Sequence, residues 1–226
     1  MNSERFDFGL DIFSELSADN FEALALRLFR YQAKHNPVYA RYIQLLGIDP
    51  TIISRLEHIP FLPVELFKHH RITTHTFQAE QIFESSTTTG ATPSRHYIKD
   101  LNWYNCSLLS DFQQFFGPAE EYVVLALLPG YLERNNASLV HMAKVLMEAG
   151  NRNESGFYLN EYEKLTSILQ LLSGTNQKVL LLGVTFALLD LAEQFPVYLA
   201  DNIKIMETGG MKGRRKELTR RQVHQR

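Results

Sequence analysis

Residues 178–210 read KVLLLGVTFALLDLAEQFPVYLADNIKIMETGG, and this stretch decides the fold class. The run KVLLLG is short, apolar throughout and closed by Gly183, as expected for a strand that is buried on both faces. TFALLDLAEQF reads as an amphipathic helix, and NIKIMETGG contains a second strand. A buried strand, a helix and another buried strand form the repeating unit of a mainly parallel sheet with helices on both faces.

The same alternation extends backward along the chain as far as residue 94. Each predicted strand is followed by a helical segment that ends near a glycine or begins a turn. The predicted strands lie within residues 94–100, 121–130 and 156–160, and the predicted helices within 101–117, 135–150 and 161–174. The sequence therefore predicts an α/β fold whose sheet is mainly parallel and flanked by helices.

The N-terminal part of the chain is predicted to be helical. Within residues 17–35, apolar side chains recur at the spacing of a helix. Asp19 and Glu22 form a plausible capping box for this helix. A second helix is expected to begin at Pro37 and to end at Gly47. This pattern predicts a helical N-terminal segment.

Two prolines shape the next stretch, HIPFLPVELFKHH. It is expected to be extended up to Leu62, with a short helix that starts at Pro63. We predict two regions in the whole chain: a helical N-terminal segment over residues 1–80 and an α/β nucleotide- and acyl-binding region over residues 81–226.

The composition excludes several classes of protein. The chain has 226 residues, of which 45% are hydrophobic and 21% charged, and its formal net charge is −2, so nothing in the overall charge favours nucleic-acid binding. A single cysteine, Cys106, excludes an internal disulfide and a cysteine-based zinc cluster. The sequence shows neither a signal peptide nor an apolar run that could cross a bilayer. We expect a cytoplasmic protein without a membrane span.

No familiar catalytic or metal-binding motif occurs. The glycine patterns of P-loop proteins, dinucleotide folds and serine hydrolases are missing. His69, His70 and His75 form a histidine cluster, but it lacks the spacing of metal ligands, so we expect surface histidines and no metal bound by protein side chains. In a parallel sheet, ligands gather where strands lead into helices. Tyr131 and Arg134 follow such a strand end and are therefore candidates for lining an acyl or nucleotide pocket.

Residues 84–97 read ESSTTTGATPSRHY, a run rich in hydroxyl groups and interrupted by Gly90. Serine and threonine hydroxyls donate hydrogen bonds to phosphate, and a glycine lets backbone N–H groups approach an anion closely. From composition alone, a polar surface loop is the more common explanation. The run precedes a predicted strand instead of following one, so we expect it to reach a site only as a mobile loop.

The segment SSTTTGATPS resembles the phosphate loop of adenylate-forming enzymes. Within that superfamily the chain is most similar to LuxE-type acyl-protein synthetases, through IPFLPVELFKHH, LLPGYLERNNASLVHM, LGVTFALLDL and METGGMKGRRKEL in this order. The resemblance implies a nucleotide site for ATP with Mg²⁺, in which two glycines lie beside the adenine and ribose. By that resemblance, the phosphate-loop residues are Ser85, Ser86, Thr88, Thr89 and Gly90, and the two glycines are Gly209 and Gly210.

The sequence departs from the superfamily pattern in three places. Thr87 replaces the middle glycine of the phosphate loop, and Ser94 stands where many relatives have lysine, which leaves Arg95 or His96 as sources of positive charge. The superfamily's Tyr-Gly-x-Thr-Glu motif, its catalytic lysine and the acyl-carrying cysteine of LuxE-type proteins do not occur before Arg226. We therefore assign no catalytic residue, expect Cys106 to be structural, and expect the 226-residue chain alone to be weak or inactive in adenylation.

The resemblance implies that a fatty acid or another carboxylate is activated as an acyl-adenylate and passed to a protein thiol. In bioluminescent systems the acyl group then goes to a fatty-acid reductase, so an acyl-accepting reductase or carrier protein is an expected partner. Two alternatives remain open at this stage. One is an acyl-CoA ligase of the phenylacetate–CoA-ligase type, and the other is a non-catalytic module that binds acyl groups or nucleotides.

Overall fold

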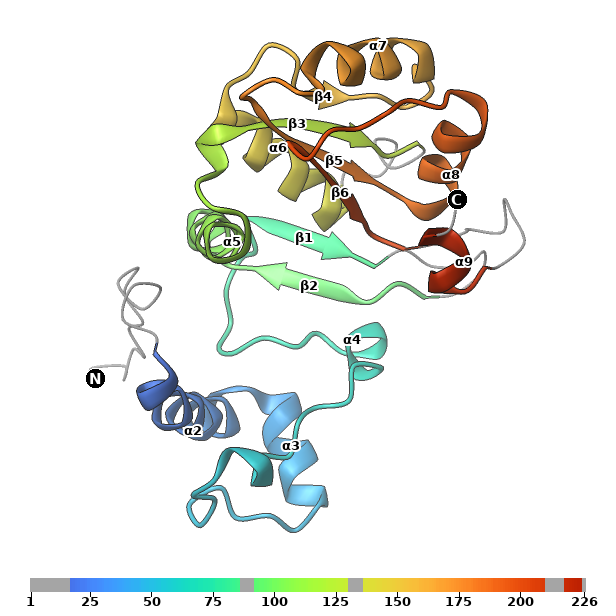
Figure 1. The fold of residues 1–226 in the computed structure, drawn as a ribbon. Coiled ribbons are helices and arrows are strands. Elements are labelled where there is room, and N and C mark those ends of the chain that lie inside the picture. Colours follow the sequence, from blue (N-terminus) through green and yellow to red (C-terminus); the bar gives the residue numbers. More distant parts are fainter. Residues whose placement is uncertain (1–16, 86–91, 130–135, 210–217, 225–226) are drawn as a thin grey trace. The chain divides into compact units, whose positions relative to one another are not determined.

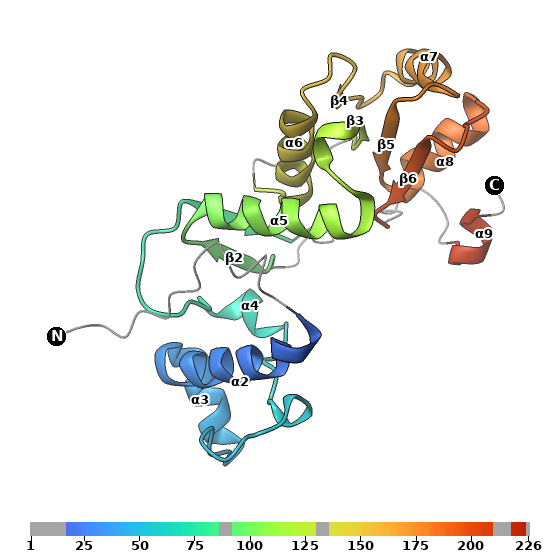
Figure 2. The same ribbon diagram turned by 60° about the vertical axis from the view of Figure 1, so that its left-hand side comes forward.

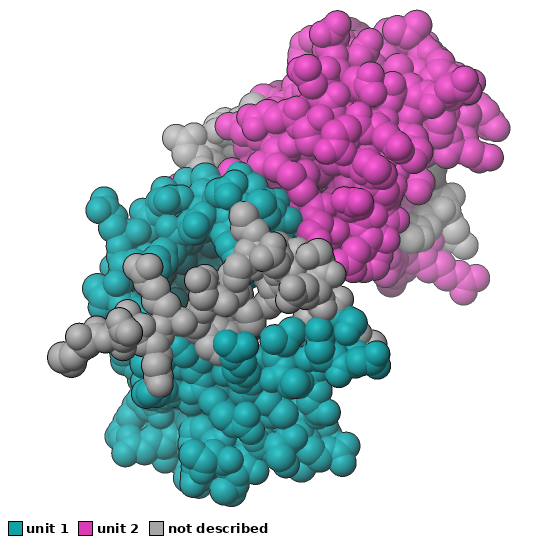
Figure 3. Space-filling model, turned by 90° about the vertical axis from the view of Figure 1, so that its left-hand side faces the viewer, with its two compact units in different colours: residues 1–107 teal, residues 108–226 magenta. Residues whose placement is uncertain are grey.

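A computed structural model describes residues 17–85, 92–129, 136–209 and 218–224 of the chain. The chain divides into two compact units, Met1–Ser107 and Leu108–Arg226, which are called unit 1 and unit 2 below (Figure 3). Each unit is described by itself.

Two helices, α2 (Ala18–His35) and α3 (Pro37–Leu45), begin the described part of unit 1 and lie side by side (Figure 1). Their apolar faces meet in a small core where the rings of Phe29 and Tyr39 pack edge to face, with centroids 6.1 Å apart. The predicted capping box of α2 is wrong. The N-cap is Ser17, whose N–H donates to Oδ1 of Asn20 at 2.9 Å, because the helix begins before Asp19 and leaves that residue in its first turn.

The second helix follows its prediction. Pro37 occupies the first helical position after the N-cap Asn36, whose Oδ1 accepts a hydrogen bond from the Tyr39 N–H at 3.2 Å. Gly47 comes shortly after the helix and has a φ of +68°, a conformation that favours glycine. Two short helices follow: η1 (Leu56–His58) and α4 (Leu66–His69). The latter begins three residues after the predicted Pro63, since residues 64 and 65 form a turn.

Unit 1 also contains a β-hairpin that the sequence predicts only in part. The predicted strand is β2 (Arg95–Ile98), and it pairs with β1 (Gln81–Glu84) in an antiparallel two-stranded sheet. The hydroxyl-rich run therefore follows one strand and precedes another, which corrects the expectation that it only precedes a strand. Buried Phe83 of β1 packs on Tyr104, with ring centroids 5.1 Å apart, and this contact ties the hairpin to the helix that follows it.

That helix, α5 (Leu101–Phe116), starts in unit 1 and continues into unit 2. Its first turn is capped by two carboxylates: Asp100 accepts from the Trp103 N–H at 2.9 Å, and Glu80 accepts from the Leu101 N–H at 2.7 Å. Negative groups stabilise the positive end of a helix. The helix ends as predicted at Gly117, which has a φ of +86°.

Unit 2 is built on a four-stranded parallel sheet with the strand order β4-β3-β5-β6. All four strands were predicted, and the parallel α/β fold is confirmed. Their bounds are β3 Tyr122–Leu127, β4 Gly156–Phe157, β5 Lys178–Gly183 and β6 Ile203–Glu207. The helical elements of the unit besides α5 are η2 Ala119–Glu121, α6 Ser138–Gly150, α7 Tyr162–Leu172, α8 Thr185–Gln194 and α9 Arg220–His224.

Helices cover both faces of this sheet. Along the sheet, the connection through α6 leads from β3 to β4 in one direction, whereas the connections through α7 and α8 lead in the opposite direction. Because such crossovers are right-handed, α6 covers one face of the sheet, and α7 and α8 cover the other. Figure 2 shows α6 on one side of the sheet and α8 on the other. The C-terminal half of α5 packs on the same face as α6, where Phe112 contacts Tyr122 with ring centroids 5.4 Å apart.

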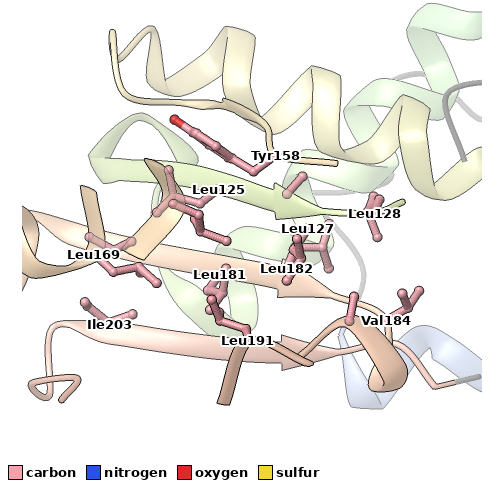
Figure 4. Packing of buried hydrophobic residues seen from close by; sticks show 14 of the residues in the cluster. Leu125, Leu127, Leu128, Tyr158, Leu169, Leu181, Leu182, Val184, Leu191 and Ile203 are labelled. Atoms are coloured by element: carbon pink, nitrogen blue, oxygen red, sulfur yellow. The ribbon is translucent and has the colours of Figure 1, made fainter. Parts of the chain in front are cut away.

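The core of unit 2 lies between the sheet and helices α7 and α8 (Figure 4). Leu125 of β3 and Leu181 of β5 are neighbours in the strand register and are almost fully buried. Residues on both faces of these strands are buried, which explains why the sequence shows continuous apolar runs instead of alternation.

Candidate functional site

The strand order of unit 2 places a topological switch point between β3 and β5, at the carboxyl edge of its sheet. The chain leaves β3 toward β4 on one side and leaves β5 toward β6 on the other, so the loops after β3 and β5 diverge. Ligands of open α/β sheets bind at such switch points. The loop after β3 contains Tyr131 and Arg134, both of which lie outside the described residues.

A carboxylate stands at the end of the next strand. Glu207, the last residue of β6, lies opposite Gly183 in the register, and its Oε1 accepts hydrogen bonds from the Thr185 hydroxyl and, at 2.8 Å, from the Gly209 N–H. Thr185 is the first residue of α8 and is buried, with 5% of its surface exposed. The carboxylate is thus held at the N-terminal end of α8, where negative charge is favoured.

The loop after β6 is fixed to the loop after β5. The N–H of Thr208 donates to the carbonyl oxygen of Gly183 at 3.0 Å, and its hydroxyl donates to the same oxygen at 3.3 Å. Gly183 allows close packing, because a Cβ there would lie 2.7 Å from the Leu188 side chain. These contacts hold the strand ends of β5 and β6 in one arrangement.

Gly209 is the only predicted nucleotide-binding glycine among the described residues, since Gly210 lies outside them. Its φ is +79°, and no atom of the described residues lies within 4 Å of the position that a Cβ would take. The backbone is therefore open to the approach of a ligand on that side. A left-handed glycine beside a fixed carboxylate is compatible with the predicted place of the adenine and ribose.

The base of the predicted phosphate loop lies in unit 1. Ser85 follows β1, its N–H donates to the Ser94 carbonyl oxygen at 3.0 Å, and its hydroxyl accepts from the Ser94 N–H at 2.9 Å. The Ser85 side chain thus closes the hairpin at the point where the loop begins. The other predicted loop residues, Ser86, Thr88, Thr89 and Gly90, lie outside the described residues.

The two cationic candidates beside this loop have different surroundings. Arg95 forms an ion pair with Glu84 across the hairpin, with Nε and Oε1 3.0 Å apart, and this pairing raises its pKa above the ordinary value. His96 has exposed surface, but its imidazole is partly removed from water. This desolvation disfavours the charged form and lowers the pKa of His96 below the ordinary histidine value. A permanent positive charge at the base of the loop therefore comes from Arg95, and it is shared with Glu84.

The structure brings Gly209 together with Glu207 and Thr185 in unit 2, whereas Ser85 belongs to unit 1. Sequence reasoning missed the pair Glu207 and Thr185. The available signal was an acidic residue at the end of an apolar strand, directly before the Thr-Gly-Gly turn. Its hydrogen-bond partner lies 22 residues earlier in the chain, and only the parallel register brings the two strand ends together.

The remaining predictions concern metals, thiols and membranes. Within the described ranges no group of three or more His, Cys, Asp or Glu side chains is placed to hold a metal ion. His69, His70 and His75 are exposed, as predicted, and Cys106 is a half-buried free cysteine in α5. No helix in the described part of the chain combines the length and apolar character that crossing a membrane requires.

Replacing Thr185 by valine is expected to lower the free energy of unfolding by about 1.5–3 kcal/mol, because it removes a hydrogen bond to a charged group at a buried position. Denaturant unfolding followed by circular dichroism measures this change. Thr166→Val is the matched control, since the Thr166 hydroxyl is buried without a hydrogen-bond partner in the described structure and its loss is expected to be neutral or stabilising. Equal effects of the two substitutions would contradict a structural role for the Thr185–Glu207 bond.

A comparison with known families gives a match over the N-terminal part of the chain. Residues 5–102 match the family described as acyl-protein synthetase, LuxE. The resemblance seen in the sequence is therefore confirmed over this range, which includes α2 to α4 and both strands of the hairpin. No curated protein matches the chain.

Proposed function

We propose that this protein, whose residues 5–102 carry the LuxE acyl-protein synthetase pattern, activates a fatty acid with ATP and takes part in its transfer to a protein thiol. The observation that carries the proposal is the extent of the match. It spans the helices of unit 1 and the β-hairpin, and thus includes the hydroxyl-rich loop between β1 and β2. An acyl-protein synthetase is a ligase, so the proposal makes the protein an acid–thiol ligase.

The described residues supply three features that suit a nucleotide. Ser85 sets the base of the proposed phosphate loop, Gly209 offers an open backbone for the adenine and ribose, and Glu207 stands beside Gly209 as a hydrogen-bond acceptor. The fatty-acid carboxylate would attack the α-phosphate of ATP and release pyrophosphate, which gives an acyl-adenylate. AMP would then be the leaving group when a thiol attacks the acyl carbon. We propose Mg²⁺ as the counter-ion of its phosphates and assign no side chain of the described residues to it.

Replacing Gly209 by alanine tests the nucleotide site. We expect the affinity for ATP, measured by calorimetry, to fall by about tenfold, because the new methyl group occupies the open space beside the backbone. Gly174→Ala is the matched control: Gly174 also has a left-handed backbone, with a φ of +75°, and open space at its Cβ position. Both variants are expected to lose about 1 kcal/mol of stability from backbone strain, but only Gly209→Ala should lower the affinity for ATP. An equal affinity of the two variants would contradict the proposed site.

The acceptor is tested with radiolabelled laurate and ATP. Because the 226-residue chain alone is expected to be weak in adenylation, we expect only a low, ATP-dependent yield of the hydroxamate that hydroxylamine forms with the labelled acyl group. Any transfer is expected to label an added reductase or carrier protein through a thiol. Coenzyme A is supplied in a parallel reaction. Acyl-CoA formation without protein labelling would instead indicate a CoA ligase, and binding of ATP or fatty acid without any activated product would indicate a non-catalytic module.

A further inference from the structure

Unit 1 contains two adjoining cavities that are separate from the loops of the proposed nucleotide site. The first has a volume of about 560 Å³ and lies along α2, against residues 56–62. The second, of about 480 Å³, extends from α2 to residues 72–77 and β2. Both volumes are typical of small-molecule sites. The residues that line both cavities, and so connect them, are Leu28, Gln32, Asn36, Phe67 and Ile72.

The first cavity is an apolar groove. Most of its lining side chains are aliphatic or aromatic, and they include the large exposed residues Phe21 and Phe61, which are 47% and 70% exposed. Ala25 lies one turn of α2 after Phe21 and also lines the groove, and its small side chain fills little of the space. Exposed apolar surface of this kind on one face marks a place where a ligand or partner binds.

The lining of the second cavity is mostly apolar but, unlike that of the first, it includes a lysine. Its polar lining residues include Lys99, Thr73, Thr74 and His96, and none of the described residues that line it is acidic. Lys99 and His96 lie on or next to β2, the strand that follows the proposed phosphate loop. This end therefore suits an anionic group and adjoins the hairpin.

Backbone strain is found at the same end. The hydroxyl of Tyr31, which lines the second cavity, lies 2.7 Å from Nε2 of His75. His75 has a φ of +63°, and its N–H donates to the His35 carbonyl oxygen at 3.0 Å, while the two imidazole rings pack with centroids 4.5 Å apart. Conformations that L residues rarely adopt persist mainly where the surroundings hold them, and they cluster at ligand sites.

We propose that the two cavities together bind a fatty acid, with its hydrocarbon chain in the apolar groove and its carboxylate in the second cavity, beside Lys99. A fatty acid has a long apolar chain and one negative end, so it matches the apolar groove and the adjoining cavity that contains Lys99. This inference rests on the proposed function, for which it names the acyl-binding residues, and it places the carboxylate in the same unit as the proposed phosphate loop.

The apolar groove is tested by filling it. Ala25→Phe in the full chain is expected to weaken the binding of palmitate, measured by displacement of a fluorescent fatty acid without ATP, by about 30-fold or more. Ala23→Phe is the matched control, because Ala23 lies on the same helix, is exposed and lines neither cavity. In the wild type, each methylene added between caprylate and palmitate should tighten binding by about fourfold. Palmitate binding that Ala25→Phe leaves unchanged would overturn the proposal.

The carboxylate end is tested by charge removal. Lys99→Gln is expected to weaken laurate binding by about fivefold while leaving dodecanol binding unchanged, because only laurate carries the charge. Lys34→Gln, which removes an exposed lysine of α2 outside the cavities, should leave both affinities unchanged. An equal loss for laurate and dodecanol would overturn the placement of the carboxylate.

These readouts are independent of the proposed activity. Fatty-acid binding that responds to Ala25→Phe and Lys99→Gln supports the acyl site even if ATP does not bind to the Gly209 region. If ATP binds as expected and the acyl group is activated, but Ala25→Phe leaves the affinity for palmitate unchanged, the proposed acyl site is overturned and the proposed function stands.

Discussion

Replacing Gly150 by alanine is expected to lower the free energy of unfolding by about 3 kcal/mol or more. Gly150 is the last residue of α6, and a Cβ at this position would lie 2.4 Å from the carbonyl oxygen of Tyr122. That oxygen belongs to the first residue of β3, which is paired with Lys178 in the sheet. Because the obstacle is backbone in a central strand, either the helix or the strand must move, and overpacking of this kind is strongly destabilising.

The effect is measured by denaturant unfolding with two probes. Circular dichroism follows both units, whereas the single tryptophan, Trp103, belongs to unit 1 and reports on that unit. Gly156→Ala is the matched control, because the nearest atoms to its Cβ position belong to Tyr158 and lie 3.8 Å or more away. It should change the stability by less than about 0.5 kcal/mol. A change below about 1 kcal/mol for Gly150→Ala would mean that α6 can move away from β3 at little cost.

The parallel sheet could be predicted because burial on both faces leaves a strong mark in the sequence. The runs YVVLAL and KVLLLG are apolar without alternation, and the helices between them are long enough to show their periodicity. The strand order could not be read in the same way. It depends on the pairing of β3 with both β4 and β5, which lie far apart in the sequence.

The hairpin was only half predicted, for a physical reason. β1 has four residues, QIFE, of which only Phe83 is buried, so neither periodicity nor a long apolar run marks it. Its stability comes from β2 and from Tyr104, contacts that the local sequence does not contain. Short strands of this kind form only with their partner.

The candidate site shows the same division between local and long-range information. Gly209 could be named from the sequence, because a Thr-Gly-Gly turn after a strand is a local pattern that resembles a known family. The Glu207–Thr185 bond could not, since it follows from the register of β5 and β6. The cavities of unit 1 also escaped prediction, because their walls come from α2, the segment after α3 and β2 together.

In the proposed function the two units make different contributions. Unit 1 holds the acyl cavities and the base of the hydroxyl-rich loop, and unit 2 holds the strand ends with Glu207 and Gly209. The strand ends of unit 2 belong to a sheet whose central strands β3 and β5 are buried on both faces, and a rigid scaffold of this kind positions a binding loop accurately. The stability of that sheet therefore bears directly on the nucleotide site.

Replacing Leu125 by alanine is expected to lower the free energy of unfolding of unit 2 by about 2–5 kcal/mol. Leu125 has no exposed surface and lies in the middle of β3, where it pairs with Gly156 on one side and Leu181 on the other (Figure 4). The substitution removes buried methyl groups and leaves a cavity that strands fixed on both sides cannot close.

The same substitution at the surface provides the control. Leu171 of α7 is 69% exposed, and Leu171→Ala is expected to change the stability by less than about 0.5 kcal/mol. Circular dichroism should report the loss in the Leu125 variant, and hydrogen exchange of the β3 and β5 amides should speed up in that variant only. Because Gly183 and Glu207 lie at the ends of strands in this sheet, ATP binding should weaken in parallel as unit 2 unfolds at lower denaturant concentrations. A Leu125 variant as stable as the Leu171 variant would contradict the close packing of this core.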